Sequence, residues 1–248
     1  MNFLSRFCAA VLLIFLAVSP GFPAGPTKPK SEKQAQAFLQ QAETAWSQNN
    51  FEEAAQSYRQ ALKVKPDLAV AHYGLGLALA RLERYQEAVS SFKEALHYKP
   101  GWARAYKDLG VSYLKLKRWP DAEKAFISSL EHQPEDAEVI YDLGVALGKQ
   151  DKHKEAREAF EKALRLKPDY VQALNNLGMA NIKLNRWAEA KSSFEKAISL
   201  NADSGEAYLG LLACYIQEGD SQKAAQTYQT LAKLNQNLAH KADELLGR

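Results

Sequence analysis

Residues 137–170 read AEVIYDLGVALGKQDKHKEAREAFEKALRLKPDY, and this stretch decides the fold. Its fixed features are a Leu-Gly pair, an alanine, a phenylalanine and a closing proline, namely Leu143, Gly144, Ala156, Phe160 and Pro168. The same features recur in the stretches on either side. The prolines keep an interval of 34 residues, at Pro66, Pro100, Pro134 and Pro168. A fixed period of this length indicates stacked copies of one small unit, whose neighbours bury a shared core.

The period divides the chain into six units: 35–68, 69–102, 103–136, 137–170, 171–204 and 205–238. We expect each unit to hold a helix A and a helix B joined by a short turn, with an aromatic residue filling the seam between them. The proline should end helix B, because it cannot continue the hydrogen-bond ladder. The aspartates that follow the proline position, Asp67, Asp169 and Asp203, are the expected N-caps of the next helix A.

The third unit shows the pattern most fully, with Leu109, Gly110, Tyr113, Ala122, Phe126 and Pro134. This pattern of Leu-Gly-x2-Tyr, then Ala-x3-Phe, then Pro resembles the tetratricopeptide repeat. The resemblance covers residues 35–238 and implies an all-α fold: a right-handed α-solenoid of about six helix pairs, with a capping helix over residues 239–248. It also implies a non-catalytic scaffold or adaptor that binds a peptide or helix of a partner protein in a concave groove.

The N-terminus has the layout of a secretory signal peptide. The residues from Phe7 to Val18 are all apolar, and small and helix-breaking residues follow them up to Gly25. We therefore predict a cleaved signal over residues 1–25, a flexible linker over residues 26–34, and export to the periplasm or the medium. A role in assembling an envelope or secreted complex would follow. The alternative is an uncleaved membrane anchor formed by residues 7–22, which would keep the protein close to a membrane.

Composition and motifs argue against several other classes of protein. The formal net charge is only +3, from 32 basic and 29 acidic residues, which is too even for a nucleic-acid binder. The sequence shows no nucleotide loop, metal-ligand spacing or nucleophile elbow, so we expect no catalytic residue, no metal and no cofactor. A structural homo-oligomer remains an alternative to the scaffold, and the oligomeric state stays open.

In tetratricopeptide repeats, partners contact fixed positions of helix A, so the resemblance assigns candidate groove residues by position. These are Tyr73, Arg104, Lys107, Tyr141, Asn175 and Asn176. Their mixture of aromatic, amide and charged groups suits an extended peptide or a partner helix, with the tyrosines as anchors. Under the alternative interpretation, Tyr73 and Tyr141 only shield neighbouring helices.

Basic residues recur near the end of helix A, at Arg81, Lys115, Lys149 and Lys183. A second basic row follows three residues later, at Arg84, Arg118, Lys152 and Arg186. One interpretation is that cations stabilise the C-terminal end of helix A, by about 0.3–1 kcal/mol each. The other is that they form a basic rim for an acidic peptide or for anionic lipid headgroups.

Overall fold

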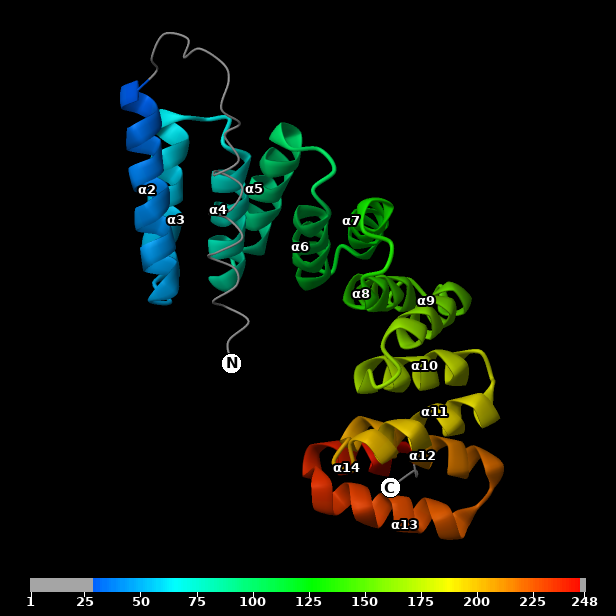
Figure 1. Cartoon of the computed structure of the whole chain (residues 1–248). Coiled ribbons are helices and arrows are strands. Elements are labelled where there is room, and N and C mark those ends of the chain that lie inside the picture. Colours follow the sequence, from blue (N-terminus) through cyan, green and yellow to red (C-terminus); the bar gives the residue numbers. More distant parts are fainter. Residues whose placement is uncertain (1–28, 246–248) are drawn as a thin grey trace. The chain divides into compact units, whose positions relative to one another are not determined.

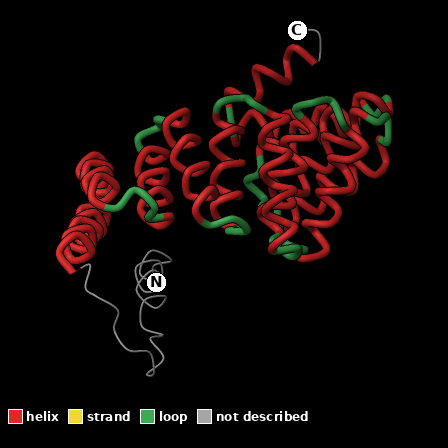
Figure 2. The backbone as a smooth tube through the Cα atoms, turned by 90° about the horizontal axis from the view of Figure 1, so that it is seen from above, coloured by secondary structure: helices red, strands yellow, loops and turns green. Residues whose placement is uncertain are grey.

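The computed structural model describes residues 29–245, which form helices joined by short turns, with no strand in that range (Figures 1 and 2). The chain divides into two larger compact units, each of which holds several of the 34-residue repeats. They are residues 1–100 (unit 1) and 101–248 (unit 2). Each consists of antiparallel helix pairs in the register that the 34-residue period predicts.

Unit 1 contains two helix pairs: α2 (Pro29–Ser47) with α3 (Phe51–Val64), and α4 (Ala69–Arg81) with α5 (Tyr85–Tyr98). Helix α2 starts within the segment predicted to be a flexible linker, so residues 29–34 are helical instead. A proline at the start of a helix loses no hydrogen bond, because the first N–H groups of a helix have no partner inside it. The predicted signal peptide lies outside the described residues.

Unit 2 contains four helix pairs and a final single helix: α6 (Ala103–Lys115), α7 (Trp119–His132), α8 (Ala137–Gly148), α9 (His153–Leu166), α10 (Val171–Lys183), α11 (Trp187–Leu200), α12 (Gly205–Glu218), α13 (Ser221–Leu234) and α14 (Gln236–Leu245). The even-numbered helices from α6 to α12 are the A helices, and the odd-numbered ones are the B helices. Helix α14 is the predicted cap and begins at Gln236, ahead of the expected residue 239.

A glycine–phenylalanine contact repeats in the seam of four helix pairs, namely α4–α5, α6–α7, α8–α9 and α10–α11. A Cβ atom built on Gly144 would stand 2.6 Å from Cε1 of Phe160, and one on Gly110 would stand 2.5 Å from Cε1 of Phe126. These separations are shorter than carbon atoms tolerate, so helix A can lie on the ring only because glycine has no side chain. The ring of Phe194 takes this role twice, because it lies close to both Gly178 and Gly210.

The helix ends agree with the period but correct one prediction. Each B helix that precedes a proline ends two residues before it, and the intervening residue, such as Lys65 or Lys167, leaves the helical conformation. The N-cap of the next helix is not the aspartate but the residue after it, for instance Leu68 or Tyr170. Asp67, Asp169 and Asp203 lie in the connecting turn itself, so the prediction that they cap a helix was wrong.

The turns between helices A and B share one unusual backbone conformation. At period 34, the residues Asn49, Glu83, Lys117, Asp151, Asn185 and Gly219 have φ between 57° and 75°. L-residues other than glycine and asparagine adopt this left-handed region at a cost of roughly 1–2 kcal/mol. The stack of helices therefore imposes one turn geometry on residues with different intrinsic preferences.

Helix α14 covers the end of unit 2. Ala242 is fully buried and packs in a cluster with Leu212 and Leu231, and Leu238 lies against the same cluster. The hydroxyl of Tyr228 donates a 2.7 Å hydrogen bond to the carboxylate of Asp243. A terminal repeat needs such a cover, because no further unit shields its apolar face.

Candidate functional site

The A helices of unit 2 form one continuous face. Besides packing on its B helix, α8 contacts α6 and α10, and α10 contacts α12. Residues four and seven positions apart lie on the same side of a helix. One surface of the A helices therefore carries Lys107 of α6, Tyr141 of α8 and Asn175 of α10, together with the side chains four and seven positions after each of them. We call this surface the inner face.

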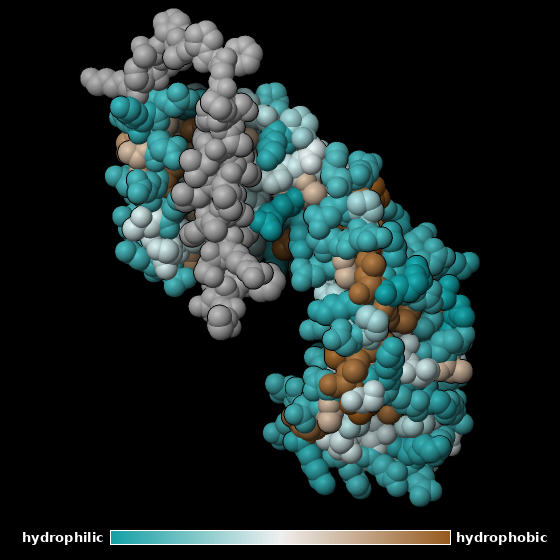
Figure 3. All heavy atoms as spheres, in the orientation of Figure 1, coloured by the Kyte–Doolittle hydropathy of each residue, from teal (hydrophilic) through white to brown (hydrophobic). Residues whose placement is uncertain are grey.

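An apolar band runs along the inner face. It consists of six side chains, which we call the inner stripe: Val111, Leu114, Val145, Met179, Ile182 and Ile216. Met179 is 46% exposed and Ile216 is 36% exposed, and the other four are half-buried. Figure 3 shows apolar side chains as a brown band that crosses α8 and α10 toward α12. The band leaves unit 2 with aliphatic surface that its own packing does not cover.

A hollow adjoins the end of the inner stripe. It has a volume of about 530 Å³ and is lined by Tyr215, Ile216, Gly219, Ser221, Ala224, Ala225, Tyr228 and Gln229. Ile216 belongs to both features, so the apolar surface continues from the inner face onto α12 and α13. Two tyrosines, an isoleucine, a glycine and two alanines give this hollow a mainly apolar wall.

Three exposed lysines border the inner stripe at the C-terminal ends of the A helices. We call Lys115, Lys149 and Lys183 the lysine row. Lys115 and Lys183 directly follow the stripe residues Leu114 and Ile182, and Lys149 stands four positions after Val145. Within the described part of the chain, none of the three forms an ion pair. Their charges therefore remain available at this edge of the face.

The second basic row is neutralised. Arg118 pairs with Asp121 at 2.8 Å, Lys152 with Glu123 at 2.7 Å and Arg186 with Glu189 at 2.6 Å. The sequence suggested two parallel basic rows. The residues of the second row pair with carboxylates at the start of the following helix B or, for Lys152, in the B helix of the preceding repeat.

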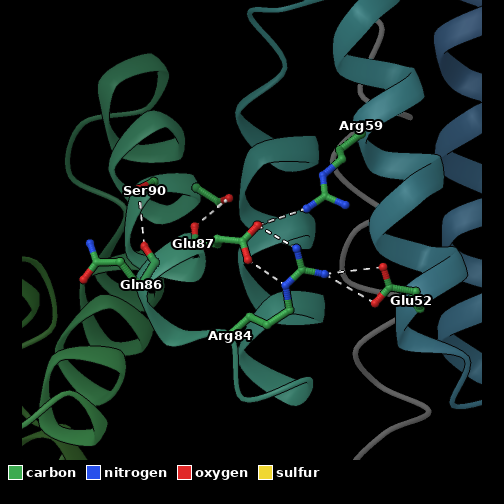
Figure 4. A network of polar contacts seen from close by, with 7 residues as sticks. Glu52, Arg59, Arg84, Gln86, Glu87 and Ser90 are labelled. Atoms are coloured by element: carbon green, nitrogen blue, oxygen red, sulfur yellow. Dashed lines mark hydrogen bonds and ion pairs between the residues drawn. The ribbon is translucent and has the colours of Figure 1, made fainter.

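In unit 1 both basic residues are engaged, Arg84 by carboxylates and Arg81 by aromatic rings. Arg84 lies between two carboxylates, 2.6 Å from Glu87 and 3.4 Å from Glu52, and Arg59 also reaches Glu87 at 3.3 Å (Figure 4). Arg81 instead places its guanidinium 4.5 Å from the ring centre of Phe51, and a second ring, Trp46, lies 5.9 Å away. The predicted rim residue of unit 1 is thus held by aromatic rings.

Of the predicted groove residues, Tyr141 lies at the centre of a polar cluster on the inner face. Its hydroxyl accepts a 2.9 Å hydrogen bond from the Asn176 side chain, and its ring centre lies 4.8 Å from that of Tyr170. The repeat pattern does not point to Tyr170, because this residue ends a repeat and lies outside helix A. Two helices and a loop thus hold a pair of rings at one place.

Carboxylates surround this ring pair. Lys107 reaches from α6 to Glu138 at 2.7 Å and to Asp136 at 3.5 Å. Burial alone would lower the pKa of Lys107, but the hydrogen bond to Glu138 and the charges of the nearby acids raise it overall. Lys107 was predicted to bind a partner, but the structure places it in ion pairs that join α6 to α8.

Burial dominates the protonation of Asp142. The pKa of this carboxyl is raised to about 6 overall, chiefly by burial; the charge of Lys107 lowers it, and the carboxylates of Glu138 and Asp136 raise it. Burial and the charge of Asp142 also raise the pKa of Tyr141. The centre of the inner face therefore holds a carboxyl that takes up a proton in mildly acidic solution.

The other predicted groove residues have different surroundings. Asn175 donates a 3.1 Å hydrogen bond to the Ser204 hydroxyl, and its own side-chain oxygen is buried without a partner in the described structure. Arg104 lies exposed on α6. Tyr73, in unit 1, is only 5% exposed and its ring centre lies 5.7 Å from that of Phe92. The inner face of unit 2 thus gathers five of the six predicted residues, and Tyr73 is not among them.

The described residues contain no group of histidine, cysteine, aspartate and glutamate side chains that could hold a metal ion. Cys214 is buried in α12, and burial raises the pKa of its thiol to about 11, which leaves it in the unreactive neutral form. Between residues 29 and 245, no helix has the length and apolar character needed to cross a bilayer.

Comparison with protein families gives two matches. A model described as the C-terminal domain of cilia and flagella-associated protein 70 matches residues 24–207, and a tetratricopeptide repeat model matches residues 185–246. Comparison with curated proteins finds no match.

Three solved structures illustrate the likeness of fold. MamA (residues 41 to the end) from Desulfovibrio magneticus RS-1 is 25% identical, with 69% of this chain and 97% of that chain covered and a TM-score of 0.66. PilW, described as a type IV pilus biogenesis factor, is 20% identical, with 86% and 98% covered and a TM-score of 0.70. YrrB, described as a TPR protein with an unusual peptide-binding site, is 21% identical, with 77% and 100% covered and a TM-score of 0.66. Six helix pairs in register, the repeated glycine–phenylalanine seam and both model matches lead to one conclusion: the chain belongs to the tetratricopeptide repeat family.

Proposed function

We propose that this protein is a non-catalytic interaction scaffold, and that the inner face of unit 2 binds a peptide or helix of a partner protein. The observation that carries the proposal is the inner stripe. Single exposed apolar side chains are ordinary on a protein surface, whereas a continuous apolar band marks an interaction site. The stripe crosses several helices, so an elongated ligand fits it better than a small molecule does.

The ring pair of Tyr141 and Tyr170 supports this function. Tyrosines are enriched among residues that contribute most to protein interfaces, because they offer a large rigid surface with a polar end. Here the Asn176 side chain fixes one hydroxyl before any partner arrives. A side chain that is already ordered loses less conformational entropy when it binds. YrrB, whose fold this chain shares, is described as having a peptide-binding site, which supports the same mode of recognition.

The proposal includes a place of action. The order of residues 1–25 favours export, and a partner would then belong to an envelope or secreted complex. PilW, described as a type IV pilus biogenesis factor, provides a precedent for this fold in assembling such a complex. If residues 7–22 remain as an anchor, the same scaffold would act at a membrane surface.

Photocrosslinking from one inner and one outer position tests the binding face. Met179 on α10 and Leu200 at the end of α11 are both 46% exposed, so they form a matched pair. Each is replaced, in the full chain and in its native host, by p-benzoyl-phenylalanine. We expect a discrete adduct from position 179 and none, or only a weak one, from position 200. Equal adducts from both positions, or none from position 179, would contradict the proposal.

The same experiment decides between a scaffold and a homo-oligomer. An adduct of twice the mass of the uncrosslinked protein, containing only peptides of this chain, would show that the inner face binds a second copy. An adduct of any other mass identifies a different partner, whose crosslinked segment is then read by mass spectrometry.

A further inference from the structure

We infer that the partner segment is amphipathic and acidic: an aliphatic row lies on the inner stripe while acidic side chains face the lysine row. This inference rests on the proposed function and adds the chemistry of the partner and the direction in which its charged edge lies. Three observations lead to it. They are the ion pairing of the two basic rows, the charge at the edge of the inner face opposite the lysine row, and the spacing of the A helices.

The first observation is the contrast between the two basic rows. In unit 2 the residues of the second row each pair with a carboxylate at 2.6–2.8 Å, whereas Lys115, Lys149 and Lys183 form no ion pair with any residue from 29 to 245. The chain thus supplies acids for one row and leaves the neighbouring row exposed beside an apolar band. An acidic ligand would neutralise these charges while it covers the stripe.

The second observation is the charge of the opposite edge. At the N-terminal ends of the A helices, the exposed residues at the equivalent position are Arg104, Glu138, Gln172 and Glu206, so two carboxylates stand against one cation. Lys107, near this edge, is already paired with Glu138 and Asp136. An acidic row placed here would meet like charges, so electrostatic complementarity orients the acidic edge toward the lysine row and away from this side.

The third observation concerns spacing. Packed helices lie about 8–10 Å apart, so successive A helices should offer an aliphatic residue and a lysine at roughly this interval. In a helical ligand, residues seven positions apart are separated by about 10.5 Å along the axis. A helix with leucines and glutamates repeating every seven residues therefore matches both rows at once.

Two synthetic helical peptides test the inference. Both contain three heptads, about 21 residues, with the same leucine row, and one carries glutamate along the adjacent edge where the other carries lysine. We expect the full chain to bind the glutamate peptide in fluorescence anisotropy, at least about fivefold more tightly than the lysine peptide at low salt. This preference should diminish at high salt, because the lysine row is exposed to screening ions.

Charge reversal locates the effect. The triple variant Lys115→Glu, Lys149→Glu, Lys183→Glu should lose the preference for the glutamate peptide. The control triple variant Lys124→Glu, Lys162→Glu, Lys196→Glu reverses three exposed lysines of the B helices, changes the net charge equally, and should keep the preference. Circular dichroism of both variants verifies that their helices are intact.

Several results would overturn the inference. They are an equal loss in both triple variants, a preference for the lysine peptide, and no binding of the glutamate peptide. Binding to phosphatidylglycerol vesicles that depends on the lysine row, without peptide binding, would assign the row to a membrane surface instead. If position 179 still crosslinks a partner whose segment is not acidic, the scaffold function stands and only this inference fails.

Discussion

At the residue scale, the fold depends on pairs of a glycine and an aromatic ring. Gly144 and Gly148 both lie in α8, but a Cβ on Gly144 would stand 2.6 Å from the Phe160 ring, whereas one on Gly148 would stand 3.8 Å from Ala156. The two glycines therefore contribute differently to the structure. The first allows close packing of helices, and the second is only a weak helix former at a helix end.

This difference gives a matched pair of variants. Gly144→Ala should lower the free energy of unfolding by about 1–3 kcal/mol, because the methyl group displaces a buried ring. Gly148→Ala should leave it unchanged or raise it by up to about 1 kcal/mol, because alanine favours the helix. Urea unfolding followed by circular dichroism measures both. Similar effects from the two substitutions would contradict the seam model.

The carboxyl of Asp142 should make stability depend on pH. Its pKa rises from the ordinary 3.8 to about 6 in the folded chain, so the folded state holds the proton more tightly than the unfolded state. Stability from this group is therefore greatest at low pH and is lost as the pH rises from about 4 to about 6. One pKa unit corresponds to about 1.4 kcal/mol, so the loss is about 3 kcal/mol at most.

The variant Asp142→Asn isolates this contribution, because an amide of similar shape does not titrate. We expect its stability relative to the parent chain to increase between about pH 4 and pH 6 and then to stay constant. Denaturant midpoints measured across that range provide the comparison. Parallel curves for parent and variant would show that Asp142 is not responsible.

At the scale of elements, the turn between helices A and B is the part whose geometry is most constrained. Lys117 has φ of 57° and so does Asn185, yet asparagine tolerates this region far better than lysine. We expect Lys117→Gly to raise the free energy of unfolding by about 0.5–1 kcal/mol, since relief of strain exceeds the added freedom of the unfolded chain.

The control for this prediction is Asn185→Gly, which should change stability less or lower it slightly. Thermal unfolding of the two variants under one buffer condition measures the difference. A larger gain from Asn185→Gly than from Lys117→Gly would mean that the turn is not strained in the way its backbone suggests.

The helices were largely predictable from the sequence, because the 34-residue repeat and the prolines that end helices can be recognised from neighbouring residues alone. Pro168 ends a helix by chemistry that depends on its neighbours alone, so the register of the six pairs followed directly. The N-caps of the A helices were predicted one residue too early. Asp67 and Asp169 lie in the connecting turn, and the residue types do not show how long this turn is. The start of α2 at Pro29 was missed because a proline can either exclude a helix or begin one.

The candidate site was harder to predict because it depends on contacts between units. Lys107 meets Glu138, a residue 31 positions away, and Lys152 meets Glu123 at a distance of 29 positions. A pattern of cations in a single sequence does not show which of them are paired. In the sequence alone, the lysine row and the second basic row are therefore equivalent.

At the scale of the whole molecule, the division at Pro100 is the feature that the repeat did not predict. The 34-residue register continues through it without an insertion, so the sequence indicated one uninterrupted array. Unit 2 nevertheless has its own hydrophobic clusters, which involve residues such as Ile140, Phe194 and Leu231, and its own cap in α14. These clusters give it what a domain needs to fold alone.

We therefore expect the fragment 101–248 to be helical by circular dichroism and to unfold cooperatively in urea. Stacked repeats gain stability from interfaces between neighbours, so four pairs with a cap suffice. A fragment that is unfolded, or that melts without a transition, would show that unit 2 depends on the preceding helices.

Hydrogen exchange of the complex decides whether the inner face of unit 2 binds a protein partner. The partner captured from position 179 is purified and added to the full parent chain, and amide exchange is compared with and without it. We expect slower exchange in α8, α10 and α12, with little change in α9, α11 and α13. Protection confined to the B helices, or to unit 1, would contradict it.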